Sequence, residues 1–243
     1  MPFTFSHPAI VLPLGYLSRR YISITGLIIG SMAPDFEYFM RMRVHSRFSH
    51  TLPGLFLFDL PLGILLAFLF HTIVRNQLIG HLPYFLQSRF TVFEPFDWHQ
   101  RFRKAWPVVA LSIIAGAASH VLWDAFTHET GYFVSIFPVL SSSIEVSGIR
   151  LPVLKVLQHG SSFIGMLVIV FTILKMPATV QNKRIVSARY WIAIILLTLL
   201  IVVLRFSGGI HYNEYGNMVV TLISAFLISL VLISAITRKS RFA

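Results

Sequence analysis

The segment 119–128 carries three side chains that could bind a metal ion: His120, Asp124 and His128. If one helix continues through them, about 100° of rotation per residue places them within about 80° on one face. Imidazole and carboxylate suit zinc, and also manganese or iron. Ionisable groups in an apolar stretch are costly and by default functional. The segment predicts a divalent metal site; a His120–Asp124 hydrogen bond that joins helices is the alternative.

Two segments nearer the N-terminus offer further candidates. A proline–aspartate pair ends at Asp35 and directs a carboxylate out of an apolar stretch, as a metal ligand or as a general base, with Glu37 as a substitute ligand. His45, Arg47 and His50 precede the first long apolar stretch. We interpret His50 as a ligand and Arg47 as a phosphate-binding group. An ordinary helix-ending turn and simple headgroup contacts are the alternatives.

His7 and His159 complete the set of candidate ligands. His7 precedes two short apolar stretches. If these form a hairpin that does not cross the membrane, His7 and Asp35 end at the same level. His159 lies about two turns into a later apolar helix, on the same expected side, with a helix-packing role as its alternative.

Other ionisable residues are interpreted differently. Asp59, close to Pro61 in an apolar stretch, is either a hydrogen-bond partner of a ligating histidine or a cap for freed backbone groups. His71, His81 and His99 are predicted to be structural or interfacial, because titratable groups at interfaces usually remain hydrated.

The rest of the chain is apolar enough to hold these residues in or beside a membrane. Of 243 residues, 56% are hydrophobic and 12% are charged, against roughly 25% charged in an average soluble domain. Five stretches reach or approach the roughly 20 apolar residues that cross a bilayer. They are 52–73, 105–126, 153–174, 190–204 and 218–236. Two shorter stretches, 8–17 and 21–33, predict a non-spanning hairpin of two short helices.

These elements predict an all-α, polytopic membrane helical bundle of about five spanning helices plus the N-terminal hairpin. We treat 1–243 as one membrane-embedded domain, with the hairpin and site loop in 1–50 and the helical bundle in 51–243. Segment 75–104 is predicted to be interfacial and amphipathic. Lys and Arg are more frequent at the helix ends that lie on the same side of the membrane as the C-terminus. The arginines before residue 50 lie on the opposite side and weaken this difference. The positive-inside rule then places the C-terminus in the cytoplasm and the candidate ligands toward the outer face.

Composition and motifs exclude several other classes of protein. The chain has no cysteine, so disulfides and cysteine-ligated metals play no part. Its net charge of +11 comes from cations between apolar runs, which fits anionic lipid better than nucleic acid. The sequence lacks the usual serine-hydrolase motifs, a phosphate-binding glycine loop and the His-Glu-x-x-His motif.

Four segments carry a resemblance to a known group: MPFTFSHPA, GSMAPDFEYF, HSRFSHTLPGLF and SHVLWDAFTH. They resemble a bacterial membrane family catalogued as domain of unknown function 4184, over nearly the whole chain. That family is similar to inner-membrane metal-dependent hydrolases with an N-terminal histidine, a Pro-Asp, a His-Arg-x-x-Thr-His-Ser element and a His-x-x-x-Asp pair. The matching positions here are His7, Asp35, residues 45–50, His120 and Asp124. Ser46 and Ser49 depart from the usual Arg and Thr.

More distantly, the order of these residues is similar to that of zinc-dependent phospholipase C, an all-helical enzyme with a multinuclear zinc site. The resemblance implies the following ligands: His7, Asp35, His50, His120, Asp124, His128 and His159. It also implies that Asp124 bridges two metals. The phospholipase pattern closes with His-x-x-x-Glu, where this chain has Phe163. We therefore expect one or two divalent ions, zinc first, with manganese or iron as alternatives.

Together, these observations predict an inner-membrane metal-dependent hydrolase with Asp35 and Arg47 as catalytic residues. Its substrate is expected to be a phosphoester such as a phospholipid headgroup, a class that follows from the resemblance alone. The expected partners are membrane lipid and this substrate, without nucleic acid. Two other functions stay open: a non-enzymatic membrane protein with a structural metal or a partner-binding role, and an ion transporter, which requires polar residues across the whole membrane.

Overall fold

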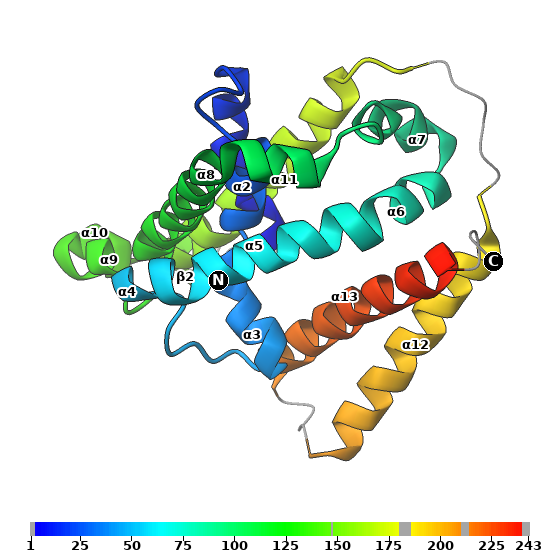
Figure 1. The fold of residues 1–243 in the computed structure, drawn as a ribbon. Helices are drawn as coiled ribbons and strands as arrows, with labels where there is room; N and C mark the ends of the chain where they lie inside the picture. The colour runs from blue at the N-terminus through cyan, green and yellow to red at the C-terminus, as the bar shows by residue number, and fades with distance from the viewer. Residues whose placement is uncertain (1–2, 147, 180–185, 210–213, 240–243) are drawn as a thin grey trace. The chain divides into compact units, whose positions relative to one another are not determined.

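The chain is almost entirely helical, as expected from its apolar stretches. The computed structural model describes residues 3–146, 148–179, 186–209 and 214–239. The longest helices are α8 (Trp98–Thr127), α11 (Val153–Lys175), α12 (Ala188–Ser207) and α13 (Tyr215–Lys239) (Figure 1). The predicted all-α fold is confirmed.

Five helical segments are long and apolar enough to cross a membrane. They are Leu52–His81, Trp98–Ile136, Val153–Lys175, Ala188–Ser207 and Tyr215–Arg238. All five predicted stretches are therefore confirmed as helices of sufficient length and apolarity, and the chain fits a multi-pass membrane protein. The first span is longer than expected, because helix continues without interruption through α4 (Leu52–Gly54), η4 (Leu55–Asp59), α5 (Leu60–Leu69), η5 (Phe70–Val74) and α6 (Arg75–His81). Most of the segment predicted to be interfacial, 75–104, is also helical, with α7 (Tyr84–Phe90) and η6 (Thr91–Phe93) after α6.

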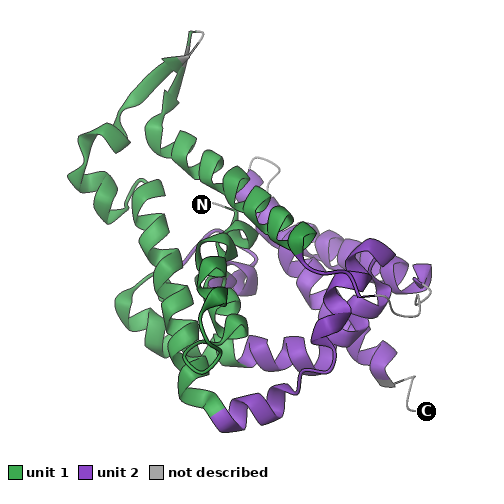
Figure 2. Ribbon diagram, turned by 90° about the horizontal axis from the view of Figure 1, so that it is seen from above, with its two compact units in different colours: residues 1–35, 48–64, 105–175 green, residues 36–47, 65–104, 176–243 purple. Residues whose placement is uncertain are grey.

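The chain divides into two compact units (Figure 2). Unit 1 consists of residues 1–35, 48–64 and 105–175, and unit 2 of residues 36–47, 65–104 and 176–243. In α8 the division falls at Ala105, whose backbone angles (φ −145°, ψ 36°) are not helical. Pro107 follows two residues later, and a proline inside a helix removes one backbone hydrogen bond.

The N-terminal part of unit 1 contains the two short helical stretches that were expected there. The first consists of η1 (Thr4–Ser6), α1 (Pro8–Val11) and η2 (Leu12–Tyr16). The second consists of α2 (Ile24–Gly30) and η3 (Ala33–Asp35). Ser23 caps α2 by accepting a hydrogen bond from the backbone N–H of Gly26, which sets the start of this helix.

Small residues bring the backbones of α2 and α8 into direct contact. A Cβ on Gly30 would lie 2.2 Å from the carbonyl oxygen of Ile113, and one on Gly116 would lie 2.4 Å from that of Leu27. Gly26 and Gly30 form a Gly-x-x-x-Gly pair, the spacing that lets membrane helices approach closely. Because no side chain separates the two helices, backbone groups of α2 can reach side chains of α8.

Helix α11 contacts residues 3–6 in a similar way. A Cβ on Gly165 would lie 2.9 Å from the carbonyl oxygen of Ser6, and the backbone N–H of Phe3 donates to Ser162 Oγ at 2.9 Å. These contacts fix η1 and the start of α1 against a long helix. They therefore determine where the side chains of residues 4–7 lie.

Between α8 and α11 the chain forms two short helices and a hairpin, which the sequence analysis did not predict. Helices α9 (Tyr132–Ile136) and α10 (Pro138–Ser141) precede strands β1 (Ser143–Val146) and β2 (Ile149–Pro152). The strands are antiparallel, with Ser143 opposite Pro152. Four residues per strand are too few to show a clear alternating pattern in the sequence.

In unit 2, α12 and α13 pack against the end of the first span. Val74, Tyr190, Ile194 and Leu230 form a buried apolar cluster. The His81 ring stacks on the Tyr190 ring at 4.1 Å. This packing agrees with the structural role predicted for His81.

The α2–α8 contact predicts that Gly30→Ala destabilises the protein. The added methyl group would overlap the backbone of Ile113, and such overpacking costs about 1–3 kcal/mol. Thermal unfolding in detergent measures the effect. Gly160→Ala is the matched control, because nothing lies within 4 Å of its Cβ position. Equal stability of the two variants would contradict the proposed importance of the contact.

Candidate metal centre

Four side chains of unit 1 converge on one point: Asp35, His50, His120 and Asp124. One ligand atom from each lies within 4.8 Å of the other three. Asp35 ends η3, His50 precedes α4, and the other two lie one turn apart on α8. The helix period alone places His120 and Asp124 on one face, whereas Asp35 and His50 reach them through tertiary packing.

The distances within this group suit a shared cation better than direct hydrogen bonds. His120 Nε2 lies 3.5 Å from Asp35 Oδ1 and 3.4 Å from Asp124 Oδ2. His50 Nε2 lies 3.6 Å and 3.5 Å from the same two oxygens. An N–H···O hydrogen bond is usually about 2.7–3.2 Å long. Ligands at zinc distances of about 2.0–2.1 Å are separated by roughly 3.3–3.4 Å in a tetrahedron.

The ring of His120 is oriented by the backbone of α2. Its Nδ1 lies 2.8 Å from the carbonyl oxygen of Ser31. A carbonyl only accepts, so Nδ1 carries the proton and a neutral ring leaves Nε2 with a free lone pair. Metal-binding histidines commonly donate their second ring N–H to a carbonyl in this way. The glycine contact between α2 and α8 makes this hydrogen bond possible.

His50 is held by a tight turn at the start of α4. Its Nδ1 lies 2.9 Å from Ser49 Oγ, and Thr51 caps the helix by accepting from the N–H of Gly54. A Cβ on Gly54 would lie 1.8 Å from the carbonyl oxygen of Phe48, so only glycine fits there. The turn directs the Nε2 atom of His50 toward the two carboxylates.

His7 lies beside this group of four. Its ring stacks on that of His120 at 3.8 Å, and its Nε2 is 3.5 Å from Asp124 Oδ1. Its Nδ1 lies 3.3 Å from the carbonyl oxygen of Thr4. The two Asp124 oxygens therefore face different histidines, Oδ1 toward His7 and Oδ2 toward His50 and His120.

His128 lies one turn beyond Asp124 on α8. Its Nδ1 is 3.2 Å from the Asp124 carbonyl oxygen and 3.6 Å from Asp124 Oδ2. The predicted common face of His120, Asp124 and His128 is thus present. His128 lies at the edge of the group, with its Nδ1 bound to the helix backbone.

Several polar atoms of this cluster are buried and, among the described residues, have no hydrogen-bond partner. They are His7 Nε2, Asp35 Oδ1, His120 Nε2, both Asp124 carboxylate oxygens and His128 Nε2. Leaving one such group unsatisfied costs about 1–3 kcal/mol, and more when it is charged. A cation held by the group of four would satisfy three of these atoms at once: Asp35 Oδ1, His120 Nε2 and one Asp124 oxygen.

The ionisation of the two ligands outside the spans also fits a cation. Burial raises the pKa of the Asp35 carboxyl, but the facing imidazoles of His120 and His50 outweigh this and hold it below its ordinary value. Burial lowers the pKa of His50, but the carboxylates of Asp124 and Asp35 raise it overall. Both directions reflect mutual stabilisation between the carboxylates and the imidazoles that face them.

Comparison with known proteins places the chain in a family. Residues 1–235 match the family described as domain of unknown function DUF4184. The chain belongs to this family. No match was found among curated proteins or among solved structures. The resemblance to metal-dependent hydrolases and to phospholipase C therefore stays a hypothesis for this DUF4184 protein.

Two further predicted site residues, His159 and Arg47, lie in different units. His159 is exposed on α11 and lies outside the group of four. The ligand role implied by the phospholipase resemblance and the helix-packing alternative both stay predictions for His159. Arg47 belongs to unit 2, where its Nε donates to His45 Nε2 at 3.1 Å. Its role at the metal site stays a prediction.

Glu37, considered as a substitute ligand, instead closes the loop of residues 41–47. Its buried carboxylate accepts from Arg41 at 2.8 Å, from Ser46 Oγ at 2.9 Å and from the N–H of Arg47 at 3.0 Å. Asp59 is fully buried in η4, and both interpretations of it stay open.

Sequence reasoning missed the residues that position the ligands. Thr4 Oγ1 donates to Asp35 Oδ2 and leaves Oδ1 to face the histidines. Ser31 offers only its carbonyl, which no side-chain pattern reveals. The Gly26-x-x-x-Gly30 spacing was visible and signals close helix packing, but its partner helix was not identifiable from sequence.

We predict that His120→Ala lowers bound metal to below about one tenth of the parent, because the change removes a ligand and its anchoring to Ser31. His159→Ala is expected to retain metal, since that side chain is exposed. Elemental mass spectrometry of protein purified without chelators measures both. Loss of metal in the His159→Ala variant would show instead that His159 is a ligand.

A second prediction concerns the hydrogen bond to Asp35. Thr4→Val keeps the shape of the side chain but removes its hydroxyl, so metal affinity is expected to fall about 10–100-fold. Thr4→Ser retains the hydroxyl and is expected to keep most of the affinity. Competition with a fluorescent zinc chelator gives both values. Equal metal affinities of the two variants would show that the Thr4 hydroxyl does not contribute to metal binding.

Proposed function

We propose that this protein is a membrane-bound metal-dependent hydrolase acting on a phosphoester. The observation that carries the proposal is the convergence of Asp35, His50, His120 and Asp124, with the Nδ1 of His120 anchored to a carbonyl. Two imidazole nitrogens and two carboxylate oxygens suit zinc best, and also manganese or iron. A bound divalent ion would polarise a phosphoryl oxygen and activate water.

The exposure of the side chains supports a site that a substrate can reach. Asp35 and His120 are fully buried, whereas the side chains of His50 and His128 are 19% and 28% exposed. The group is closed by protein around Asp35 and His120, and an open position would lie on the side of His50 and His128, although their Nε2 atoms are themselves buried. Catalytic zinc sites keep such an accessible position for water or substrate.

Asp35 fits a ligand role better than that of a general base. Its Oδ2 is occupied by Thr4 and its Oδ1 faces two imidazoles. The Oδ1 atom of Asp124 faces His7 and lies outside the first set of contacts. This supports a second ion, bridged to the first by the Asp124 carboxylate. We therefore keep one or two ions in the proposal.

The placement of the ligands along the chain supports a lipid headgroup as substrate. His50 lies two residues before the first candidate span, so it belongs near the level of the headgroups. Hydrolysis would break the phosphorus–oxygen bond, with the water oxygen added to phosphorus and a proton delivered to the leaving alcohol. Arg47 is the proposed phosphate contact. We further propose an inner-membrane location, with the C-terminus cytoplasmic and the site toward the outer face.

One observation favours a second candidate function, a structural metal site. The group already supplies four protein ligands, which is the number that structural zinc sites use. In that case, the ion would join η3, the turn before α4 and α8 without any reaction.

The test is hydrolysis of phospholipid by metal-loaded protein, compared with Asp35→Asn, which is similar in shape but loses the charge. We expect the parent to release phosphorylated headgroup from mixed micelles, followed by phosphorus NMR, and the variant to lose at least about 100-fold. Cobalt substitution should give a spectrum that changes when inorganic phosphate is added. An inert, four-coordinate cobalt spectrum with no turnover would favour the structural site.

Absence of metal from the parent, after purification without chelators and attempted reloading, would overturn both functions. The four side chains would then serve only to hold the helices together.

A further inference from the structure

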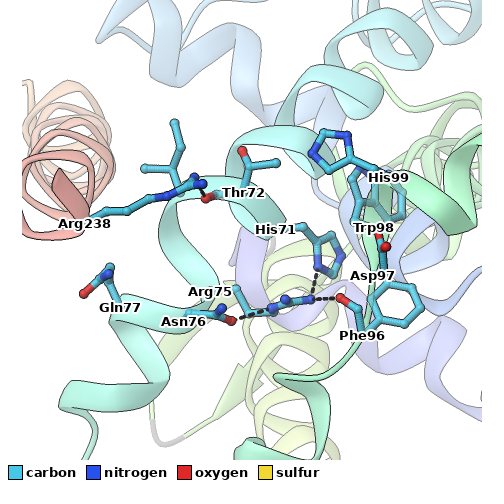
Figure 3. A pocket seen from close by; sticks show the side chains of 11 residues that line it. His71, Thr72, Arg75, Asn76, Gln77, Phe96, Asp97, Trp98, His99 and Arg238 are labelled. Carbon is cyan, nitrogen blue, oxygen red and sulfur yellow. Dashed lines mark hydrogen bonds between the residues drawn. The ribbon is translucent and has the colours of Figure 1, made fainter. Parts of the chain in front are cut away.

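Unit 2 contains a polar cavity that has no part in the metal centre. Its volume is about 350 Å³, and Figure 3 shows the side chains that line it. It is lined by His71, Thr72, Ile73, Arg75, Asn76, Gln77, Phe96, Asp97, Trp98, His99 and Arg238. Small-molecule sites typically begin at about 300 Å³, so the cavity can hold a compact polar group.

The cavity lies where three candidate spans end. Residues 71–77 belong to the last turns of the first span, Trp98 begins the second, and Arg238 ends the fifth. Alternate crossing of the membrane puts these three ends on one side. Basic pockets between helices at this level are a common form of recognition for anionic headgroups.

Arg75 forms a rigid wall of the cavity. Its guanidinium donates to the carbonyl oxygen of Phe96 at 2.8 Å and to Asn76 Oδ1 at 2.9 Å (Figure 3). It also donates to the carbonyl oxygen of Glu94 at 3.1 Å. Its Nη1 also lies 3.0 Å from His71 Nδ1. Most of its donors are therefore used, two of them on the backbone of the segment 94–96. The arginine keeps its positive charge beside the cavity.

Arg238 brings a second positive charge from α13. Its Nη1 donates to the carbonyl oxygen of Thr72, which holds the side chain across the cavity (Figure 3). The residue is exposed. Arg238 can therefore contact a ligand that enters from the membrane surface.

Two buried polar atoms of the lining have no hydrogen-bond partner among the described residues. They are the indole Nε1 of Trp98 and the Oε1 of Gln77. The two residues are only 2% and 5% exposed. An indole N–H can only donate and a carbonyl oxygen can only accept. A ligand that satisfies both must offer an acceptor and a donor.

The charge of the lining favours an anion. Arg75 and Arg238 contribute two positive charges and Asp97 one negative charge, so the lining is +1 with His71 and His99 neutral. Asp97 Oδ1 is engaged by the backbone N–H of Gln100 at 2.9 Å, where it caps the start of α8. Its charge is thus partly used by the helix terminus.

We propose that this cavity binds a phosphate group that carries a hydroxyl or ammonium donor, as in a phospholipid headgroup or a small phosphate ester. The phosphate oxygens would accept from Arg238 and from Trp98 Nε1, and the donor would meet Gln77 Oε1. The proposal is independent of the metal-dependent function, since no residue of the cavity belongs to that site.

The test measures binding of glycerol phosphate to the detergent-solubilised full chain by calorimetry. We expect saturable binding, weakened at least tenfold in Arg238→Gln and in Trp98→Phe, which removes the N–H and keeps an aromatic ring. Arg103→Gln is the matched control, because this exposed arginine lies outside the cavity lining. Thermal unfolding and metal content should be unchanged in Arg238→Gln, which separates this outcome from any failure of the metal site.

A second arm distinguishes the source of the phosphate. The parent and Arg238→Gln are delipidated and then incubated with nanodiscs of phosphatidylglycerol or phosphatidylcholine, and retained lipid is measured by native mass spectrometry. Retention of phosphatidylglycerol by the parent but not by Arg238→Gln identifies the ligand as a lipid headgroup. Binding of glycerol phosphate without lipid retention identifies it as a soluble phosphate ester. No saturable binding of either probe, or an equal loss in Arg103→Gln, would overturn the proposal.

Discussion

The close contact between α2 and α8 is the constraint on which the metal centre depends. Gly30 and Gly116 leave no side chain between the two backbones, so the Ser31 carbonyl reaches His120 Nδ1 at 2.8 Å. The same approach brings η3, and with it Asp35, to the face of α8 that carries Asp124. A helix pair separated by ordinary side chains would be about 8–10 Å apart between axes. The ligand geometry is therefore a consequence of backbone packing.

The distribution of acidic residues shows how the fold treats charge in an apolar chain. Of nine acidic residues, four are buried: Asp35, Glu37, Asp59 and Asp124. Glu37 is satisfied by an arginine, a hydroxyl and a backbone N–H, which marks it as structural. Asp35 and Asp124 instead face imidazoles at distances beyond a hydrogen bond. A buried carboxylate with incomplete partners is expensive, and the second pair belongs to a cluster that could hold a cation.

The same criterion separates the two arginines of the unit 2 cavity. Arg75 uses most of its donors on two backbone carbonyls and on the side chains of Asn76 and His71, whereas Arg238 makes one described hydrogen bond and is exposed. Both sites of this DUF4184 protein thus combine satisfied groups that give rigidity with unsatisfied groups that point to a ligand. The proposal for the cavity does not depend on the metal centre. Its charge and its unpartnered polar atoms come from its own lining residues.

The sequence determined the elements and the types of ligand. Apolar length predicted five spans, and the helix period placed His120, Asp124 and His128 on one face, because both properties are local. It could not decide which distant residues join them. His159 had a suitable type and level but is exposed on α11, whereas Thr4 had no motif and supports Asp35. Only the tertiary structure made that choice, because the rotation of a helix about its axis and the approach of two backbones depend on packing between segments far apart in the chain.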